Sequence, residues 1–303
     1  MRRLQVAVSL LLFVTTAAVA QNSRSAVSLN GNDANTCTLV APCRTFGVAL
    51  AHTNPGGEVI ALDSAGYGQF TVTQAVTISG APGVHAALMG TGANAVSVNA
   101  GATDAVVLRN LVILAGAGAV NGIEILSANS VHVLNCLVRG FTANSGVAVI
   151  GNGAQNTLID HLVAEENSLG VTIFTNAQVR ARITNSEIDN NTIGVYAIND
   201  VEAVVSNTSI SGNGTGVHVQ STLSTTADVT LDHCIISSNG KGIFATNPDI
   251  NLRAVVRLYG NVISYNIGAG VQNSSSTAFT YGNNALSANH PDVMGGLTAL
   301  AQQ

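Results

Sequence analysis

The feature that most constrains the fold is a repeat of about 24 residues in the second half of the chain. Each unit carries a glycine followed by two apolar residues that flank one variable residue, as in Gly146-Val147-Ala148-Val149. The spacings between the glycines are 24, 24, 24, 22, 26 and 28, for Gly122, Gly146, Gly170, Gly194, Gly216, Gly242 and Gly270. One unit cannot bury its own apolar face, so the units must stack on one another.

Two polar columns accompany these glycines. The first consists of Asn167, Asn191, Asn213, Asn239, Asn266 and Asn289. The second lies six residues earlier and consists of His161, Asn185, Asn207, His233, Gly260 and Asn283. Asparagine and glycine tolerate left-handed backbone angles that other residues resist, so both columns indicate corners between strands. Stacked asparagine side chains would hydrogen-bond along a corner and satisfy the polar groups of the tight turn.

The runs between the corners are short and rich in Val and Ile, which favours strands over helices. Three short strands and three corners per turn give a coil whose successive turns lie ~4.8 Å apart. Leucine-rich repeats have a similar period, but their Leu-x-x-Leu-x-Leu signature is absent. The sequence therefore predicts an all-β fold, a single-stranded parallel β-helix or solenoid.

The amino-acid composition excludes several other classes. Charged residues make up 9% of the chain, too few for the charged outer faces of a helical bundle, and 47% hydrophobic residues exclude a disordered chain. Without the first 20 residues, 9 Lys and Arg stand against 16 Asp and Glu, a net charge of 9 − 16 = −7. No basic stripe is present, so we expect no nucleic-acid partner.

The N-terminus has the pattern of a secretory signal peptide over residues 1–20. Arg2 and Arg3 precede an apolar run from Val6 to Val14, and small residues follow up to Ala20. A membrane anchor is the alternative, but the run is shorter than the ~20 residues that span a bilayer. We expect cleavage near Ala20, a secreted or periplasmic protein, and no membrane span in the mature chain.

The Asn-x-x-Gly-[Val/Ile]-x-[Val/Ile] units resemble the repeats of the pectate-lyase-like superfamily, whose parallel β-helix is right-handed. The resemblance covers about 105–290. It implies a single β-helix domain over 21–303, with an N-terminal cap over about 21–60 and a C-terminal cap over about 291–303. Residues 42–50 fit a short amphipathic helix that covers the open end of the coil, since an uncovered end would expose backbone edge and core.

The four cysteines fall into two classes. Cys37 and Cys43 enclose five residues in a polar, turn-rich segment, which predicts a small disulfide loop suited to an exported protein. Cys136 and Cys234 lie 98 residues apart in apolar strand contexts, and we expect both to be buried thiols.

Ligands of the superfamily commonly lie along one sheet and the loops beside it, and the Gly-[Val/Ile]-x-[Val/Ile] strands are the natural candidate here. Strand alternation turns the variable residue outward. This outward column is Glu124, Ala148, Thr172, Tyr196, His218, Phe244 and Gln272. We predict a ligand-binding face made of Thr172, Phe174, Tyr196, His218 and Phe244, whose rings would pack against sugar rings. The alternative is that the rings only stabilise the sheet through pairs on neighbouring strands.

Acidic residues gather at one corner of successive units. In-register stacking places Glu165 beside Asp189, and like charges ~5 Å apart repel unless a cation intervenes or one group is protonated. One hypothesis is a Ca²⁺ site formed by Glu165, Glu187 and Asp189. Another is a catalytic set of Glu166, Asp189 and His218. The alternative is that these carboxylates extend separately into solvent.

Three functions remain open at this point. The first is an exported β-helix protein that contacts carbohydrate or the cell surface through the Gly-[Val/Ile]-x-[Val/Ile] sheet. The second is a polysaccharide lyase or glycoside hydrolase that acts on an acidic polysaccharide, and the third is a purely structural or adhesive solenoid. No Arg or Lys stands in the outward column, and the polygalacturonase motifs Gly-His-Gly and Arg-Ile-Lys are absent. No catalytic residue can therefore be assigned from the resemblance.

Overall fold

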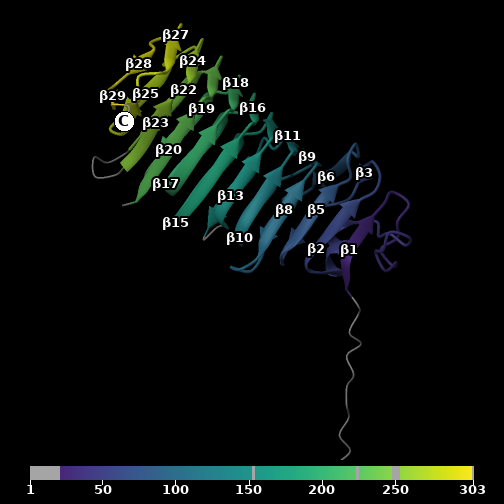
Figure 1. Ribbon diagram of the computed structural model, residues 1–303. Helices are drawn as coiled ribbons and strands as arrows, with labels where there is room; N and C mark the ends of the chain where they lie inside the picture. Colours follow the sequence, from purple (N-terminus) through teal and green to yellow (C-terminus); the bar gives the residue numbers. More distant parts are fainter. Residues whose placement is uncertain (1–20, 152–153, 223–224, 248–252, 302–303) are drawn as a thin grey trace, which may run out of the picture.

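The computed structural model describes residues 21–301 except 152–153, 223–224 and 248–252. Within these limits the chain winds into an elongated parallel β-helix, with β1 near one end and β27 to β29 at the other (Figure 1). The predicted signal peptide, residues 1–20, lies outside the described residues.

The described strands form two parallel sheets. The larger has nineteen strands. They are β1 (Asn22–Val27), β2 (Thr53–Ala61), β4 (Phe70–Val72), β5 (Val76–Gly80), β7 (Val96–Asn99), β8 (Ala105–Arg109), β10 (Ile123–Leu134), β12 (Ser145–Gly151), β13 (Ala154–Asp160), β15 (Leu169–Thr184), β17 (Ile193–Ser206), β19 (Thr215–Gln220), β20 (Thr226–Asp232), β22 (Lys241–Thr246), β23 (Arg253–Tyr259), β25 (Val271–Ser274), β26 (Thr277–Thr280), β28 (Val293–Met294) and β29 (Thr298–Ala299).

The smaller sheet has ten strands. They are β3 (Ala65–Gly66), β6 (Ala86–Gly90), β9 (Leu111–Ala115), β11 (Leu137–Arg139), β14 (Val163–Glu165), β16 (Glu187–Asp189), β18 (Ser209–Ser211), β21 (Ile235–Ser237), β24 (Val262–Ser264) and β27 (Ala285–Ser287). We call this the short-strand sheet. Its strands follow one another in chain order, as expected for a coil that adds one strand per turn.

The large sheet contains two ladders joined by its longest strands. The first part of β15 pairs with β12, and its second part pairs with β13. We call the ladder through the first part of β10, β12, the first parts of β15 and β17, β19 and β22 the Gly-Val ladder, because its units carry the repeated glycine. The second ladder runs from β1 through β2, β5, β8, the second part of β10, β13, the second parts of β15 and β17, β20 and β23. The predicted three strands per turn are thus present, with two of them merged in some turns.

The register of the Gly-Val ladder equals the sequence period. Val147 pairs with Val171, Val171 with Val195, and Val195 with Val217. The side chains of all four are completely buried in the coil. Equivalent positions therefore lie directly above one another, as the repeat predicts.

The predicted asparagine corner is present and buried. The Asn191 Oδ1 atom accepts hydrogen bonds from the Asn167 backbone N–H at 2.9 Å and from its Nδ2 at 3.1 Å. The same pair of bonds links Asn213 to Asn191 at 2.8 and 3.1 Å. Each side chain thus satisfies the backbone of the turn below it, which lets a tight corner be buried.

The other predicted corner also has the expected backbone. Its φ angles are +53° at His161, +50° at Asn185, +49° at Asn207, +52° at His233 and +65° at Gly260. The last member of the column, Asn283, differs, because the left-handed residue of that turn is Gly282, with a φ of +79°. These left-handed angles explain why asparagine and glycine recur there, since most other residues would be strained.

A helix covers the N-terminal end of the coil, as predicted. Helix α1 (Phe46–Ala51) begins inside the predicted segment 42–50 and ends one residue after it, and it buries Phe46, Ala49 and Leu50 against the first turn. The predicted disulfide joins Cys37 to Cys43 beside it. At the other end, β28 and β29 continue the ladders by pairing in parallel with β25 and β26. The C-terminal cap over about 291–303 stays a prediction.

Parallel pairing starts well before the predicted repeats. β1 already pairs with β2, and β2 with β5, so the parallel coil extends into the segment predicted as the N-terminal cap. Cys136 and Cys234 are free and buried, as predicted. The described part of the chain contains no helix long and apolar enough to cross a membrane.

Candidate functional site

Three of the predicted aromatic residues form a continuous stack on the Gly-Val ladder. Tyr196 pairs in register with His218, and His218 with Phe244. The ring centroids are 4.7 Å apart for Tyr196 and His218, with planes 14° apart. They are 4.8 Å apart for His218 and Phe244, with planes 25° apart. The rings thus lie face to face along the axis of the coil.

This orientation decides which ring faces can meet a ligand. Both faces of His218 are covered by its two neighbours in the stack. The Lys241 Nζ atom lies over the Phe244 ring, 4.4 Å from its centroid. The Tyr196 hydroxyl donates a hydrogen bond to the Gln220 Oε1 atom at 2.7 Å, which fixes the ring. The outer face of Tyr196, turned toward Thr172, remains for contact with another molecule.

His218 is held as a neutral ring within the stack. Burial and, to a smaller extent, the nearby charge of Lys241 together lower its pKa to about 4. Its Nε2 atom is buried and has no hydrogen-bond partner among the described residues. A neutral, desolvated imidazole packs like a small aromatic ring, and this environment opposes the protonated form that an acid catalyst needs.

A groove opens where the stack ends. The outward residues of the two preceding turns, Thr172 and Ala148, are small and form its floor. Phe174, Leu169, Ile150 and other mostly apolar side chains line it, and its volume is about 400 Å³. We call this groove the slot. Its floor residues are nearly inaccessible to water because the larger neighbours stand above them, although the Phe174 ring itself is 40% exposed.

The end of the slot opposite Tyr196 is polar. The Glu124 carboxylate accepts hydrogen bonds from the Asn94 Nδ2 atom at 2.7 Å and from the Asn121 Nδ2 atom at 3.2 Å. Beside the floor, the Ser145 hydroxyl donates to the Thr172 Oγ1 atom at 3.0 Å. The slot therefore combines an aromatic platform, apolar walls and a fixed carboxylate.

The predicted ligand-binding residues are divided by this geometry. Thr172, Phe174 and Tyr196 line the slot, whereas His218 and Phe244 lie farther along the stack. Glu124 belongs to the predicted outward column but not to the predicted ligand-binding residues. The sequence nevertheless contains a sign of the slot. Only small residues stand between Glu124 and Tyr196 in the outward column, and they leave space that large aromatic side chains would fill.

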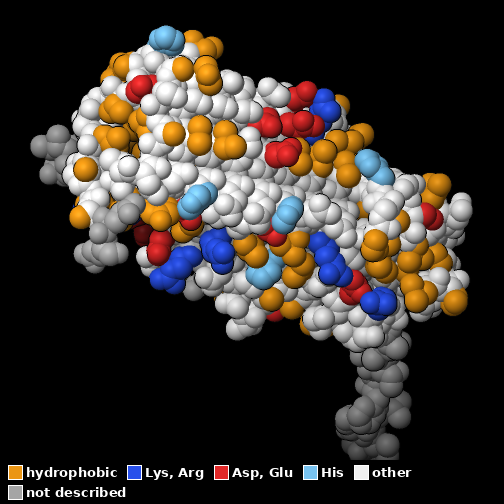
Figure 2. Space-filling view, turned by 45° about the horizontal axis from the view of Figure 1, so that its top comes forward, with side chains coloured by type: hydrophobic (Ala, Val, Ile, Leu, Met, Phe, Trp, Pro, Cys, Tyr) orange, Lys and Arg blue, Asp and Glu red, His pale blue; other side chains and the backbone are white. Residues whose placement is uncertain are grey.

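The acidic corner forms as predicted, but it contains its own cation. Glu165 pairs in register with Asp189, and Glu187 lies at the start of β16. The Arg139 guanidinium is 3.5 Å from Glu165 and 2.8 Å from Glu166. In Figure 2 acidic side chains gather on the upper part of the face beside a basic one.

The metal hypothesis for this corner has no direct support from the side-chain arrangement. Among the described residues, no three His, Cys, Asp or Glu side chains are grouped closely enough to hold a metal ion. The Asp189 Oδ1 atom accepts hydrogen bonds from the backbone N–H and hydroxyl of Ser211, at 3.0 and 2.8 Å. The Ca²⁺ site of Glu165, Glu187 and Asp189 stays a prediction, which a rise of Tm on adding Ca²⁺ would support.

The predicted catalytic set is spread over different elements. Glu166 follows β14 in a left-handed conformation with a φ of +57°, Asp189 ends β16, and His218 lies within β19 of the Gly-Val ladder. A hollow of about 520 Å³ includes Glu166, but neither Asp189 nor His218 lines it. Among the described residues, no hollow brings the three side chains together, and the catalytic roles stay a prediction.

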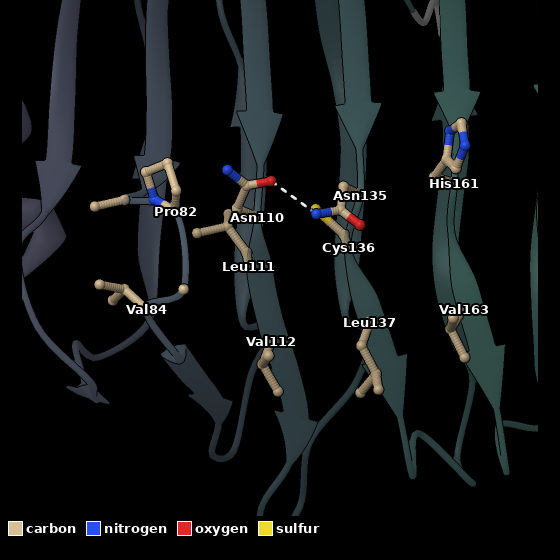
Figure 3. A pocket seen from close by; sticks show the side chains of 12 residues that line it. Pro82, Val84, Asn110, Leu111, Val112, Asn135, Cys136, Leu137, His161 and Val163 are labelled. Atoms are coloured by element: carbon tan, nitrogen blue, oxygen red, sulfur yellow. Dashed lines mark hydrogen bonds between the residues drawn. The ribbon is translucent and has the colours of Figure 1, made fainter.

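Another hollow, of about 490 Å³, lies beside the short-strand sheet. Figure 3 shows Asn110, Asn135 and His161 along it, in the corners of neighbouring turns, with a hydrogen bond of 2.9 Å between the two asparagines. The His161 Nδ1 atom lies 3.0 Å from Asp160. These are corner residues with left-handed backbones, and the hollow follows from the shape of the corner.

Comparisons with known proteins agree with this fold. The family described as the right-handed β-helix region matches residues 121–287, more than half of the chain. No curated protein matches at the level of sequence. Among solved structures, an alginate lyase from Paenibacillus sp. str. FPU-7 is similar with a TM-score of 0.61 and 14% identity, over 92% of this chain and 100% of that one.

Two further structures share the coil. The pectate lyase Pel9A has a TM-score of 0.54 and 13% identity, over 94% of this chain and 80% of its own. Tailspike protein 2 from the Escherichia coli O157:H7 bacteriophage CAB120 has a TM-score of 0.57 and 12% identity, over 84% of this chain and 38% of its own. At these identities the likeness establishes the fold alone. The strand register, the family match and these structures together show that the chain belongs to the right-handed β-helix family.

Proposed function

We propose that the protein binds carbohydrate in the slot of the Gly-Val ladder. The observation that carries this proposal is the outer face of the Tyr196 ring, which borders an apolar groove with a carboxylate at its far end. The apolar face of a sugar ring packs against an aromatic ring, while its hydroxyls need hydrogen-bond partners such as Glu124 and Ser145. The slot offers both.

The comparisons support a carbohydrate ligand in general terms. The alginate lyase and the pectate lyase are named for their action on polysaccharides, and both wind their chains into the same coil. Binding is favoured over cleavage because two residues of the predicted catalytic set are already engaged. Arg139 pairs with Glu166, and with Glu165 beside it, while His218 is buried as a neutral ring.

Two variants test this proposal. Tyr196→Ala removes the platform, and Phe174→Ala removes an exposed wall of the slot. We expect each to weaken binding of the best ligand from a glycan array at least tenfold by isothermal titration calorimetry. Tyr259→Ala is the matched control, since Tyr259 is also 40% exposed but lies on the second ladder. Unchanged affinity in Tyr196→Ala would rule out the slot.

We also propose that the protein is exported. The basic and apolar N-terminal residues and the Cys37–Cys43 disulfide support this, because such bonds persist in oxidising compartments. N-terminal sequencing of the mature protein from the periplasm or the medium should begin at Gln21. An intact N-terminus in a cytoplasmic fraction would contradict the proposal.

A further inference from the structure

We infer that the slot accepts one uncharged pyranose ring as the next member of the aromatic stack, and that Glu124 excludes sugars that carry a carboxylate. This inference rests on the proposed function and names the class of sugar that the slot selects. It concerns the slot alone and not the acidic corner.

The spacing of the stack sets the position of the bound ring. Tyr196, His218 and Phe244 follow one another at 4.7 and 4.8 Å, which is the distance between successive turns. Thr172 and Ala148 occupy the next two turns with side chains too short to reach the height of the rings. A ligand ring over Thr172 would therefore lie against Tyr196 at the same spacing as His218 does on its other side.

The length of the slot sets the distance between the ring over Thr172 and the Glu124 carboxylate. Glu124 is three turns from Tyr196 through Ala148 and Thr172, a span of ~14 Å. The Tyr196 ring and the Glu124 carboxylate each occupy one end of that span. The space between them is about two turns high, so a ring over Thr172 leaves one turn, over Ala148, between itself and the carboxylate for the hydroxyl groups that reach Glu124.

The charge of the slot determines which ring is accepted. Two asparagine amides hold the Glu124 carboxylate, and no Lys or Arg is among the described residues that line the slot. A carboxylate accepts several hydrogen bonds, so Glu124 can still accept them from sugar hydroxyls. A uronic acid would instead bring a second carboxylate into an apolar groove without a cation, which costs free energy by repulsion and lost hydration.

The basic side chains of the molecule lie elsewhere. Of the eight described arginines, six belong to the second ladder, namely Arg24, Arg109, Arg180, Arg182, Arg253 and Arg257. Lys241 lies over Phe244 at the opposite end of the stack from the slot. The positive charge that an acidic sugar requires is therefore separated from the Tyr196 platform.

The test uses pairs of methyl glycosides that differ only in the group at C6. The pairs are glucose and glucuronic acid, galactose and galacturonic acid, and mannose and mannuronic acid. Affinities are measured by NMR titration of the full chain, of Glu124→Gln, and of Glu187→Gln as a control. Glu187 is an exposed carboxylate on the short-strand sheet, so its replacement changes the net charge equally.

We expect at least one neutral glycoside to bind at least tenfold more tightly than its uronic partner. Glu124→Gln should reduce this ratio to threefold or less, because the amide can donate to the sugar carboxylate, while Glu187→Gln should leave the ratio unchanged. A ratio that Glu124→Gln does not change would overturn the role of Glu124.

Other outcomes separate this inference from the proposed function. If uronic glycosides bind as tightly as neutral ones and Tyr196→Ala abolishes both, the inference is wrong and the carbohydrate site stands. If Tyr196→Ala leaves the binding of every glycoside unchanged, or if no glycoside binds, the proposed function itself is wrong and the inference falls with it.

Discussion

At the scale of single residues, position within a turn determines what a side chain can do. Tyr196 and His218 occupy equivalent positions on neighbouring strands, yet only Tyr196 keeps a ring face for a ligand. The register was predictable from the repeat, because equivalent positions stack. The ring orientation was not, since it depends on χ angles and on contacts such as the hydrogen bond of Tyr196 to Gln220.

His218 should make the stability of the coil depend on pH. Its folded-state pKa of about 4 lies below the usual 6.5, so the unfolded chain takes up a proton first as the pH falls. The stability contributed by the neutral ring is therefore complete above pH 6.5 and is lost as the pH falls from 6.5 to about 4. Allowing for partial exposure, we expect a loss of about 2 kcal/mol.

Urea unfolding at pH 7 and pH 4 measures this effect. His218→Phe cannot take up a proton, so its free energy of unfolding should fall less between the two pH values by that amount. His85→Phe is the control, because His85 is exposed and lies outside the stack. Equal pH dependence in the wild type and His218→Phe would show that the ring is not protected from protonation.

Thr157 offers a stabilising substitution. Its side chain is 3% exposed, and its Oγ1 atom has no hydrogen-bond partner among the described residues. An unpaired buried hydroxyl costs about 1–3 kcal/mol, and valine has nearly the same shape. Thr157→Val should therefore raise Tm. Thr184→Val is the contrasting variant, because the Thr184 hydroxyl donates to Asp160 at 3.1 Å, and it should lower Tm.

At the scale of elements, the corner residues predict the local backbone more specifically than the strand residues do. The asparagine corner and the corner with left-handed backbone angles were both predictable from the sequence, because only a few residue types suit such backbones. The slot was not predicted, because it arises where small residues stand between Glu124 and Tyr196 and has no sequence motif of its own. A repeat therefore predicts the strands and corners of the coil well, and it predicts local deviations from the regular coil poorly.

Substitutions at the asparagine corner should destabilise the coil more than substitutions at the exposed corner. Asn191→Ala removes the acceptor of the Asn167 backbone N–H and the donor to the Ala164 carbonyl, which lies 3.0 Å from Asn191 Nδ2. Both groups are buried, so we expect a loss of about 3–5 kcal/mol in urea unfolding. Asn185→Ala, at an exposed corner with a φ of +50°, should cost only about 1 kcal/mol. Similar costs for the two would contradict this account.

At the scale of the whole molecule, several arginines of the second ladder are spaced apart along the coil or paired with carboxylates. Arg182 and Arg257 share one column of the second ladder and are three turns apart, ~14 Å, which exceeds the Debye length at physiological salt. Arg24 pairs with Glu58, and Arg257 with Asp228. This spacing limits repulsion between like charges. Among the described residues, no arginine lies on the Gly-Val ladder.

Because each turn contacts mainly its neighbours, damage at one end should remain local. Phe46→Ala empties a fully buried position in α1, where the ring packs against Tyr67 and Phe70 at 5.2 and 5.4 Å. A large-to-small change of this kind costs about 3–5 kcal/mol, but in a solenoid the loss falls on the adjoining turns. Hydrogen exchange should therefore increase in β1, β2 and β5 and remain slow in β17, β19 and β22. Ligand affinity at the slot should be unchanged under the same conditions. If exchange instead rose equally along the whole coil, the protein would unfold as one cooperative unit, and its end caps would stabilise the binding site directly.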